Sequence, residues 1–172
     1  MRKLNALLYL FLIGLVSLTA CTDDDDEDSG PKVAENTINI DGITKSVTIA
    51  GTIDLTGSTT TSDHYMLIIT DGEGDNAVGI GLNLAPNATT LAGTFNPVSS
   101  EEEDPAPNTF SYAFIGFDCT EGDDCNQEYN TAATPVGKVT ITKDGNVYTV
   151  NFDITFEGNK KGLGNYRGNI LM

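Results

Sequence analysis

The chain has a single histidine, and this limits the catalytic chemistry that its sequence can support. His64 is the side chain best suited to act as an acid or a base near neutral pH. Ser62 and Asp63 lie close to it, but adjacent residues of a strand point to opposite faces of the sheet. The chain also lacks a Gly-x-Ser-x-Gly elbow, a His-Glu-x-x-His pair and a glycine-rich phosphate loop. We therefore predict no catalytic residue and no enzymatic activity.

Carboxylates are the most abundant reactive groups, with 25 Asp and Glu residues against 9 Lys and Arg residues. Two facing carboxyl groups can hydrolyse a glycosidic bond without a histidine. With so many acidic residues, some pairs come close by chance, so their number alone does not indicate an active site. A carboxylate-dependent hydrolase is therefore the remote alternative to a non-catalytic role.

One glycine-rich turn, Asp71-Gly-Glu73-Gly-Asp75-Asn76, carries acidic side chains at alternate positions. Oxygen ligands spaced in this way are typical of calcium loops. The segment differs from the helix-flanked calcium loop, because it has no Gly at the sixth position and no acidic residue at the twelfth. Asp and Gly also favour hairpin turns for backbone reasons alone. We predict calcium at Asp71, Glu73 and Asp75, with a plain turn as the alternative, and we expect no other cofactor.

Tyrosine is the aromatic residue most suited to a sugar-binding surface here, since the chain has no tryptophan. Most of the tyrosines occupy positions that the strand pattern directs toward the core. Tyr129 follows Cys125 in a segment that we expect to be a loop, so we predict it as a ligand contact. The expected ligand is a protein or a glycan.

The first twenty residues have the composition of a secretory signal peptide. Arg2 and Lys3 precede an apolar run from Ala6 to Val16, and small residues follow the run. The run is shorter than the ~20 apolar residues that a membrane-spanning helix needs. A buried core helix is disfavoured, because six acidic residues follow at positions 23–28. We predict a cleaved signal peptide over residues 1–20.

The tetrad Leu18-Thr19-Ala20-Cys21 resembles the lipobox of bacterial lipoproteins. The resemblance implies that the Cys21 thiol is diacylated, that the signal is cut just before it, and that the new amino terminus is acylated. Two or more acyl chains hold a protein stably on a membrane, whereas one chain binds only marginally. The expected modification is therefore lipidation at Cys21, and the membrane is the expected partner of this anchor.

The acidic run after Cys21 resembles the export signal that sends lipoproteins of Bacteroidetes-type bacteria to the cell surface. The closing segment, Gly137 to Gly168, resembles hairpins of uncharacterised lipoproteins from those bacteria. These resemblances imply an outer-membrane location facing outward, and they supply no activity. We interpret residues 21–34 as a lipidated cysteine and a disordered acidic tether, because this composition cannot bury enough apolar surface to offset chain entropy.

The net charge of −16 restricts the partners of the chain. Removal of residues 1–20 would make the mature protein more acidic still, because Arg2 and Lys3 would be lost. Such a surface repels nucleic acid and anionic lipid headgroups, and it attracts divalent cations or basic partners. Nucleic acid is therefore excluded as an expected partner.

Once lipid is assigned to Cys21, Cys119 and Cys125 remain as a pair. Export permits a disulfide, and the short intervening sequence is typical of a tight loop. A zinc pair is the alternative, but zinc needs further ligands and the chain has one histidine. We predict the disulfide Cys119–Cys125.

From about residue 35 the sequence consists of short alternating segments separated by turn residues. In the clearest strand, Val147 to Phe156, every second residue is large and apolar. Asp144-Gly145 and Asp41-Gly42 each separate two such runs, as in a β-hairpin. The alternation in residues 109–117 places Phe110, Tyr112 and Phe114 on one face. Other expected strands are 37–40, 43–50, 52–55, 64–70, 77–84, 91–95, 137–143 and part of 162–172.

No stretch after residue 21 shows helical periodicity over more than about two turns, and Gly and Thr are abundant. We predict an all-β protein with one antiparallel domain over residues 35–172. About eight to ten strands would form a β-sandwich or an up-and-down β-barrel. Residues 99–108 and 119–134 are the expected long loops, where binding tends to occur.

The expected function is that of a lipid-anchored, surface-exposed, non-catalytic binding or accessory module. The alternative is a structural or adhesive component of a surface assembly that exchanges a strand with its neighbour. A long unprotected edge strand would favour the assembly component, whereas an open, polar-lined mouth would favour ligand binding.

Overall fold

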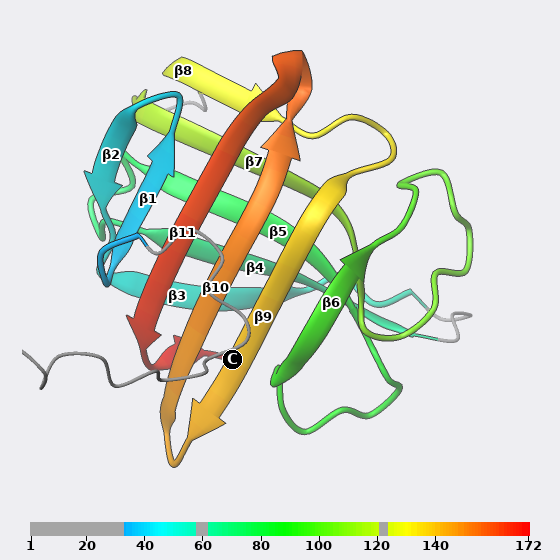
Figure 1. Ribbon diagram of the computed structural model, residues 1–172. Helices are drawn as coiled ribbons and strands as arrows, with labels where there is room; N and C mark the ends of the chain where they lie inside the picture. The colour runs from blue at the N-terminus through cyan, green and yellow to red at the C-terminus, as the bar shows by residue number, and fades with distance from the viewer. Residues whose placement is uncertain (1–32, 58–61, 121–123) are drawn as a thin grey trace, which may run out of the picture. The chain divides into compact units, whose positions relative to one another are not determined.

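The computed structural model describes residues 33–57, 62–120 and 124–172 (Figure 1). These residues belong to one unit, Pro31–Met172. The predicted signal peptide, Cys21 and nearly all of the acidic tether lie outside the described residues.

The described residues form an all-β fold of twelve strands and one short 3-10 turn, η1 (Glu157–Asn159), with no α-helix among them. The all-β prediction is thus confirmed. In chain order the strands are β1 (Thr37–Ile40), β2 (Ile43–Ser46), β3 (Ile49–Asp54), β4 (Asp63–Thr70), β5 (Ala77–Leu84), β6 (Gly93–Pro97), β7 (Thr109–Cys119), β8 (Cys125–Asn130), β9 (Val136–Asp144), β10 (Val147–Phe156), β11 (Lys160–Gly168) and β12 (Ile170–Leu171).

The strands make one mixed sheet that curls into a half-barrel with two facing layers (Figure 1). The first, here called the β10 layer, has the order β6-β9-β10-β11-β1-β2. The second, here called the β5 layer, has the order β12-β3-β4-β5-β7, and β8 pairs with β7. The core therefore lies between two β layers, as in a sandwich.

The chain passes between the layers at two corners. Strand β6 pairs with β9 through residues 93–95 and with β7 through residues 96 and 97. At the other corner, Val47 N donates to Asn36 O near β1, and the next residue, Thr48, donates to Thr70 O at the end of β4. The expected strand 43–50 is thus divided between the two layers as β2 and β3.

Two details of the predicted architecture are wrong. The described residues contain twelve strands rather than eight to ten, and two of their pairings are parallel, β6 with β7 and β12 with β3. Both parallel pairings involve short segments at the boundary between the layers. Alternation within a segment shows which face is buried, but it does not show the direction of the neighbouring strand.

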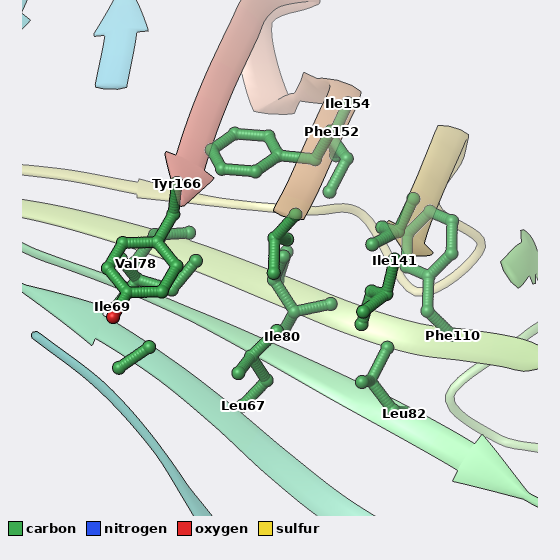
Figure 2. Close-up of a cluster of buried hydrophobic side chains, with 14 of the residues drawn as sticks. Leu67, Ile69, Val78, Ile80, Leu82, Phe110, Ile141, Phe152, Ile154 and Tyr166 are labelled. Atoms are coloured by element: carbon green, nitrogen blue, oxygen red, sulfur yellow. The ribbon is translucent and has the colours of Figure 1, made fainter. Parts of the chain in front are cut away.

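The core is formed by alternate side chains of the two layers (Figure 2). In β5, Val78, Ile80 and Leu82 are fully buried, and they belong to the same core cluster as buried residues of β10 such as Ile154. Complete burial of one such side chain stabilises the fold by ~1.5–3 kcal/mol. The inward set predicted for β10 is confirmed in full, because all five of its members are buried: Tyr148, Val150, Phe152, Ile154 and Phe156.

Strand β7 contains a β-bulge that contradicts another expectation. Gly81 of β5 pairs with Tyr112, whereas the next residue of β5 pairs with Phe110, so Ser111 is an extra residue. The bulge shifts the alternation of β7 by one position. Phe110 is therefore fully buried in the core, while Tyr112 and Phe114 lie on the outer side of the layer. The prediction that these three aromatic residues share one face is wrong.

Candidate binding cleft

A cleft of about 470 Å³ opens at one end of the β5 layer. It is formed by β3, β4, the end of β5, the loop from β5 to β6 and the last residue of the chain. Its polar lining is Thr52, Asp54, Thr89 and Thr90, and its apolar and aromatic lining is Tyr65, Leu84, Ala88, Leu91 and Met172.

The cleft continues the core-facing side of the layer beyond the region that the rest of the fold covers. Ala50, Thr52 and Asp54 alternate along the same side of β3. Ala50 is fully buried, Thr52 is half-buried and Asp54 is exposed. The side chains of Thr52 and Asp54 occupy positions that would extend the core, but they face an open space. Polar residues are therefore tolerated at these positions.

The loop from β5 to β6 is held by hydrogen bonds to its backbone. Asn87 N donates to the Asp63 carboxylate at 2.7 Å, and Ala92 N donates to Thr90 Oγ at 3.1 Å. Leu91 is buried and anchors the loop in the core. The threonines of this loop are thus presented by an ordered segment, as a preformed binding site requires.

Asp54 and Tyr65 are cross-strand neighbours in the cleft. A hydrogen bond from Thr56 N, with a second contribution from the Thr56 side chain, lowers the pKa of Asp54. The pKa of Tyr65 is raised by burial first and by the negative charges of Asp54 and Asp63 second. At neutral pH the cleft therefore presents an ionised carboxylate beside a neutral phenol.

These groups suit a ligand rich in hydroxyl groups. The carboxylate accepts hydrogen bonds, while the phenol and the threonine hydroxyls both donate and accept them. Leu84 and Leu91 add apolar surface for the carbon skeleton of the ligand. Asp54 is the one Asp or Glu among the described residues that line the cleft, whereas the hydrolase alternative needs two facing carboxyl groups.

His64 lies on the outer side of the β5 layer and not in the cleft. Its Nδ1 is 2.6 Å from Asn83 Oδ1, and Asn83 Nδ2 donates to Thr109 Oγ at 3.0 Å. Because the Asn83 amide oxygen is an acceptor here, Nδ1 of His64 is the donor. The neighbouring Ser62 is buried and its hydroxyl donates to Pro105 O. These contacts tie β4, β5 and β7 together at the end of the layer.

The predicted calcium residues lie in the turn between β4 and β5. The Asp71 carboxylate accepts hydrogen bonds from Gly74 N at 2.9 Å and Asn76 Nδ2 at 2.6 Å, while Glu73 and Asp75 are exposed. In the part of the chain that the structure describes, no three His, Cys, Asp or Glu side chains form a group that could hold a metal ion. Calcium at Asp71, Glu73 and Asp75 stays a prediction.

The predicted disulfide is confirmed, because Cys119 and Cys125 are bonded between β7 and β8. Both sulfur atoms lie close to Gly116, where a side chain would collide with them. The glycine therefore provides the space in which the disulfide lies.

Tyr129 lies in strand β8 rather than in the expected loop, so that assignment is wrong. Its ring packs edge-to-face against Phe117, with 6.4 Å between the ring centres, and Lys160 Nζ lies 5.0 Å from its centre. Tyr129 is half-buried against the core and is not part of the cleft lining. Its role as a ligand contact stays a prediction.

Sequence reasoning missed the cleft because its residues come from four separate segments. The available signal was local: Thr89 and Thr90 occur in the loop that follows the mostly apolar segment 77–84. Polar residues just beyond a buried strand are common, so that signal does not identify a site without the fold.

Comparison of the chain with protein-family models, curated proteins and solved structures finds no match. Across residues 33–57, 62–120 and 124–172, no helix has the length and apolar character needed to cross a bilayer.

Proposed function

We propose that this chain is a lipid-anchored lipoprotein of the outer membrane, facing outward, which binds a glycan without transforming it. The observation that carries the proposal is the cleft, where Tyr65, Asp54, Thr89 and Thr90 surround a space of about 470 Å³. The lipobox at Cys21 and the acidic run behind it support the location.

The test is a binding measurement on the full chain held in lipid nanodiscs, using an array of defined oligosaccharides. Tyr65→Ala and Thr89→Val should each weaken binding of the selected saccharide about tenfold, as expected for the loss of ~1–1.5 kcal/mol per contact. Thr142→Val is the matched control, because Thr142 is an exposed strand residue outside the cleft. Binding that is equally strong in all variants, or no saccharide bound at all, would refute the proposal.

The alternative role as a strand-exchanging assembly component has less support. Strand exchange uses a long, unprotected edge strand. Among the described strands, β2 at one end of the sheet has four residues and β12 at the other end has two. Strand β8, which pairs with β7 alone, is a further edge with six residues, and the disulfide joins its first residue to β7.

A further inference from the structure

The outer side of the β5 layer carries a continuous set of apolar residues, here called the outer apolar face. The strand registers place them in two rows: Ile53-Met66-Gly81-Tyr112 and Gly51-Ile68-Gly79-Phe114. Leu171 of β12 lies beside Gly51, and Ile49 lies at the next outward position of β3. Leu171 is 67 % exposed, Ile53 50 % and Ile49 43 %.

Two glycines of β5 shape this face. A Cβ atom on Gly79 would collide with the ring of Phe114, and one on Gly81 would collide with the ring of Tyr112. The aromatic rings therefore lie across the backbone of β5 instead of standing away from the sheet. The bulge at Ser111 directs both aromatic residues to this side.

The outer side of the other layer has the opposite character. Its central row is Thr140-Asn151-Asn165-Thr37-Ser46, and Asn165 Nδ2 donates to Asn151 Oδ1 at 2.6 Å. Both layers belong to the same unit, so an apolar outer side is not a general requirement of this fold. A large apolar patch on one side only is typical of a contact surface.

Charge is divided between the layers in the same way. Residues 46–137, which supply every strand of the β5 layer except β12, contain no Lys or Arg and 14 Asp or Glu. All Lys and Arg of the described residues lie on β2, β9 or β11. Lys45 of β2 pairs with Asp118 at 2.6 Å. Glu73 and Asp75 are exposed in the β4–β5 turn at one end of the outer apolar face, and Glu128 of β8 is exposed opposite Gly116 at the same end.

We propose that the outer apolar face is the docking surface for a protein partner whose contact surface has an apolar centre bordered by Lys and Arg. The acidic residues at the border of the face attract such a partner and repel a second copy of this chain, which would bring the same acidic residues together. They repel anionic lipid headgroups for the same reason.

The size of the face is that of a small, transient interface. The two rows occupy ~14 Å of strand length across five strands ~4.8 Å apart, which gives on the order of 340 Å² per partner. The total of about 700 Å² is below the ~1,200 Å² of stable complexes, as in transient protein–protein contacts. The proposal is separate from glycan binding, because the face and the cleft lie on opposite sides of the β5 layer.

The first test places the photo-crosslinking residue benzoylphenylalanine at Ile53 of the full chain in cells that produce it. Ile49 serves as a second position on the same face, and Asn151, on the outer side of the β10 layer, as the control. The expected result is a crosslink from Ile53 and Ile49, but not from Asn151, to a different protein at a peptide that combines apolar residues with Lys or Arg. A crosslink to a second copy, to lipid, or to a peptide without basic residues would overturn the proposal, as would the absence of any crosslink.

The second test changes the surrounding charge while the crosslinker stays at Ile53. Glu128→Lys and Asp75→Lys should each lower the crosslink yield several-fold, and so should sodium chloride at about 0.5 M. Asp144→Lys, at the exposed end of β9, should leave the yield unchanged. A crosslink yield that stays the same after all three changes would contradict the proposal that Lys and Arg border the contact surface of the partner. Thr89→Val in the cleft should also have no effect, which separates this test from that of glycan binding.

Discussion

Asp71 fixes the turn between β4 and β5 through its carboxylate oxygens. Burial acts to raise the pKa of Asp71, but hydrogen bonds from the Asn76 side chain and from the backbone of Gly74 and Glu73 outweigh it, and the pKa is lowered. A carboxyl group whose pKa is lower in the folded state stabilises the fold above its unfolded pKa of ~3.9. That stabilisation is lost as the pH falls through the folded pKa.

We therefore predict that Asp71→Asn lowers the free energy of unfolding at pH 7, and that its difference from the wild type shrinks below about pH 4. Urea denaturation at several pH values measures this difference. Glu73→Gln is the control, because Glu73 is exposed and its substitution should change little. A difference that stays constant down to pH 2.5 would contradict the role of the Asp71 charge.

The disulfide closes a short loop between neighbouring strands. Replacement of both Cys119 and Cys125 by Ser should lower the free energy of unfolding by about 2 kcal/mol, the value expected for so short a loop. Chemical denaturation measures the loss, and the wild type under reducing conditions should behave like the double variant. Equal stability of the oxidised wild type and the double variant would show that the bond does not stabilise the fold.

Among the strands, β5 and β7 depend on each other through glycines and aromatic rings. Gly79→Ala should lower the free energy of unfolding by ~1–3 kcal/mol, because the new methyl group collides with the ring of Phe114. In a Phe114→Ala background, the same substitution should cost much less. Denaturation of the four proteins of this cycle gives the coupling directly. Purely additive effects would mean that the ring does not lie over Gly79.

Several strands could be predicted from the sequence because their signals are local. Strands β1, β5 and β10 have the bounds expected from alternation and from flanking turn residues such as Asp41-Gly42. Strand β8 was missed because Asn126, Gln127 and Glu128 give it no apolar alternation. The bulge at Ser111 was missed because the register of β7 depends on its partner strand, and a single extra residue leaves no mark in its own sequence.

At the scale of the whole molecule, the proposed location of the domain depends on the proposed lipidation of Cys21. Cys21→Ala should release the protein from the membrane fraction, because the acyl chains would have no attachment site. In intact cells producing the unchanged chain, a broad-specificity protease should digest the domain if it faces outward. Membrane association that persists in Cys21→Ala would refute the anchor, and full protection in intact cells would refute the outward orientation.

The proposed binding regions could not be predicted from the sequence to the same extent as the strands. The cleft combines side chains from β3, β4 and the loop before β6 with the final residue, and the outer apolar face joins five strands. Such groupings depend on which strands become neighbours and on which side each residue faces. The division of charge was nevertheless visible in the sequence, as the absence of Lys and Arg from residues 46–137.

The uneven distribution of Lys and Arg along the chain also determines where proteases can cut it. Trypsin cleaves after Lys and Arg, so it would leave Ser46 to Lys138 as one fragment even in the unfolded protein. Its cleavage sites among the described residues all lie on β2, β9 and β11, whereas a protease specific for Asp and Glu has 14 sites within residues 46–137. Under native conditions, cleavage requires local opening of the backbone. Tryptic cleavage would therefore report on the opening of the β10 layer. The second protease also has sites there, at Asp144 and Asp153, so only its cuts within residues 46–137, identified by fragment mass, would report on the β5 layer.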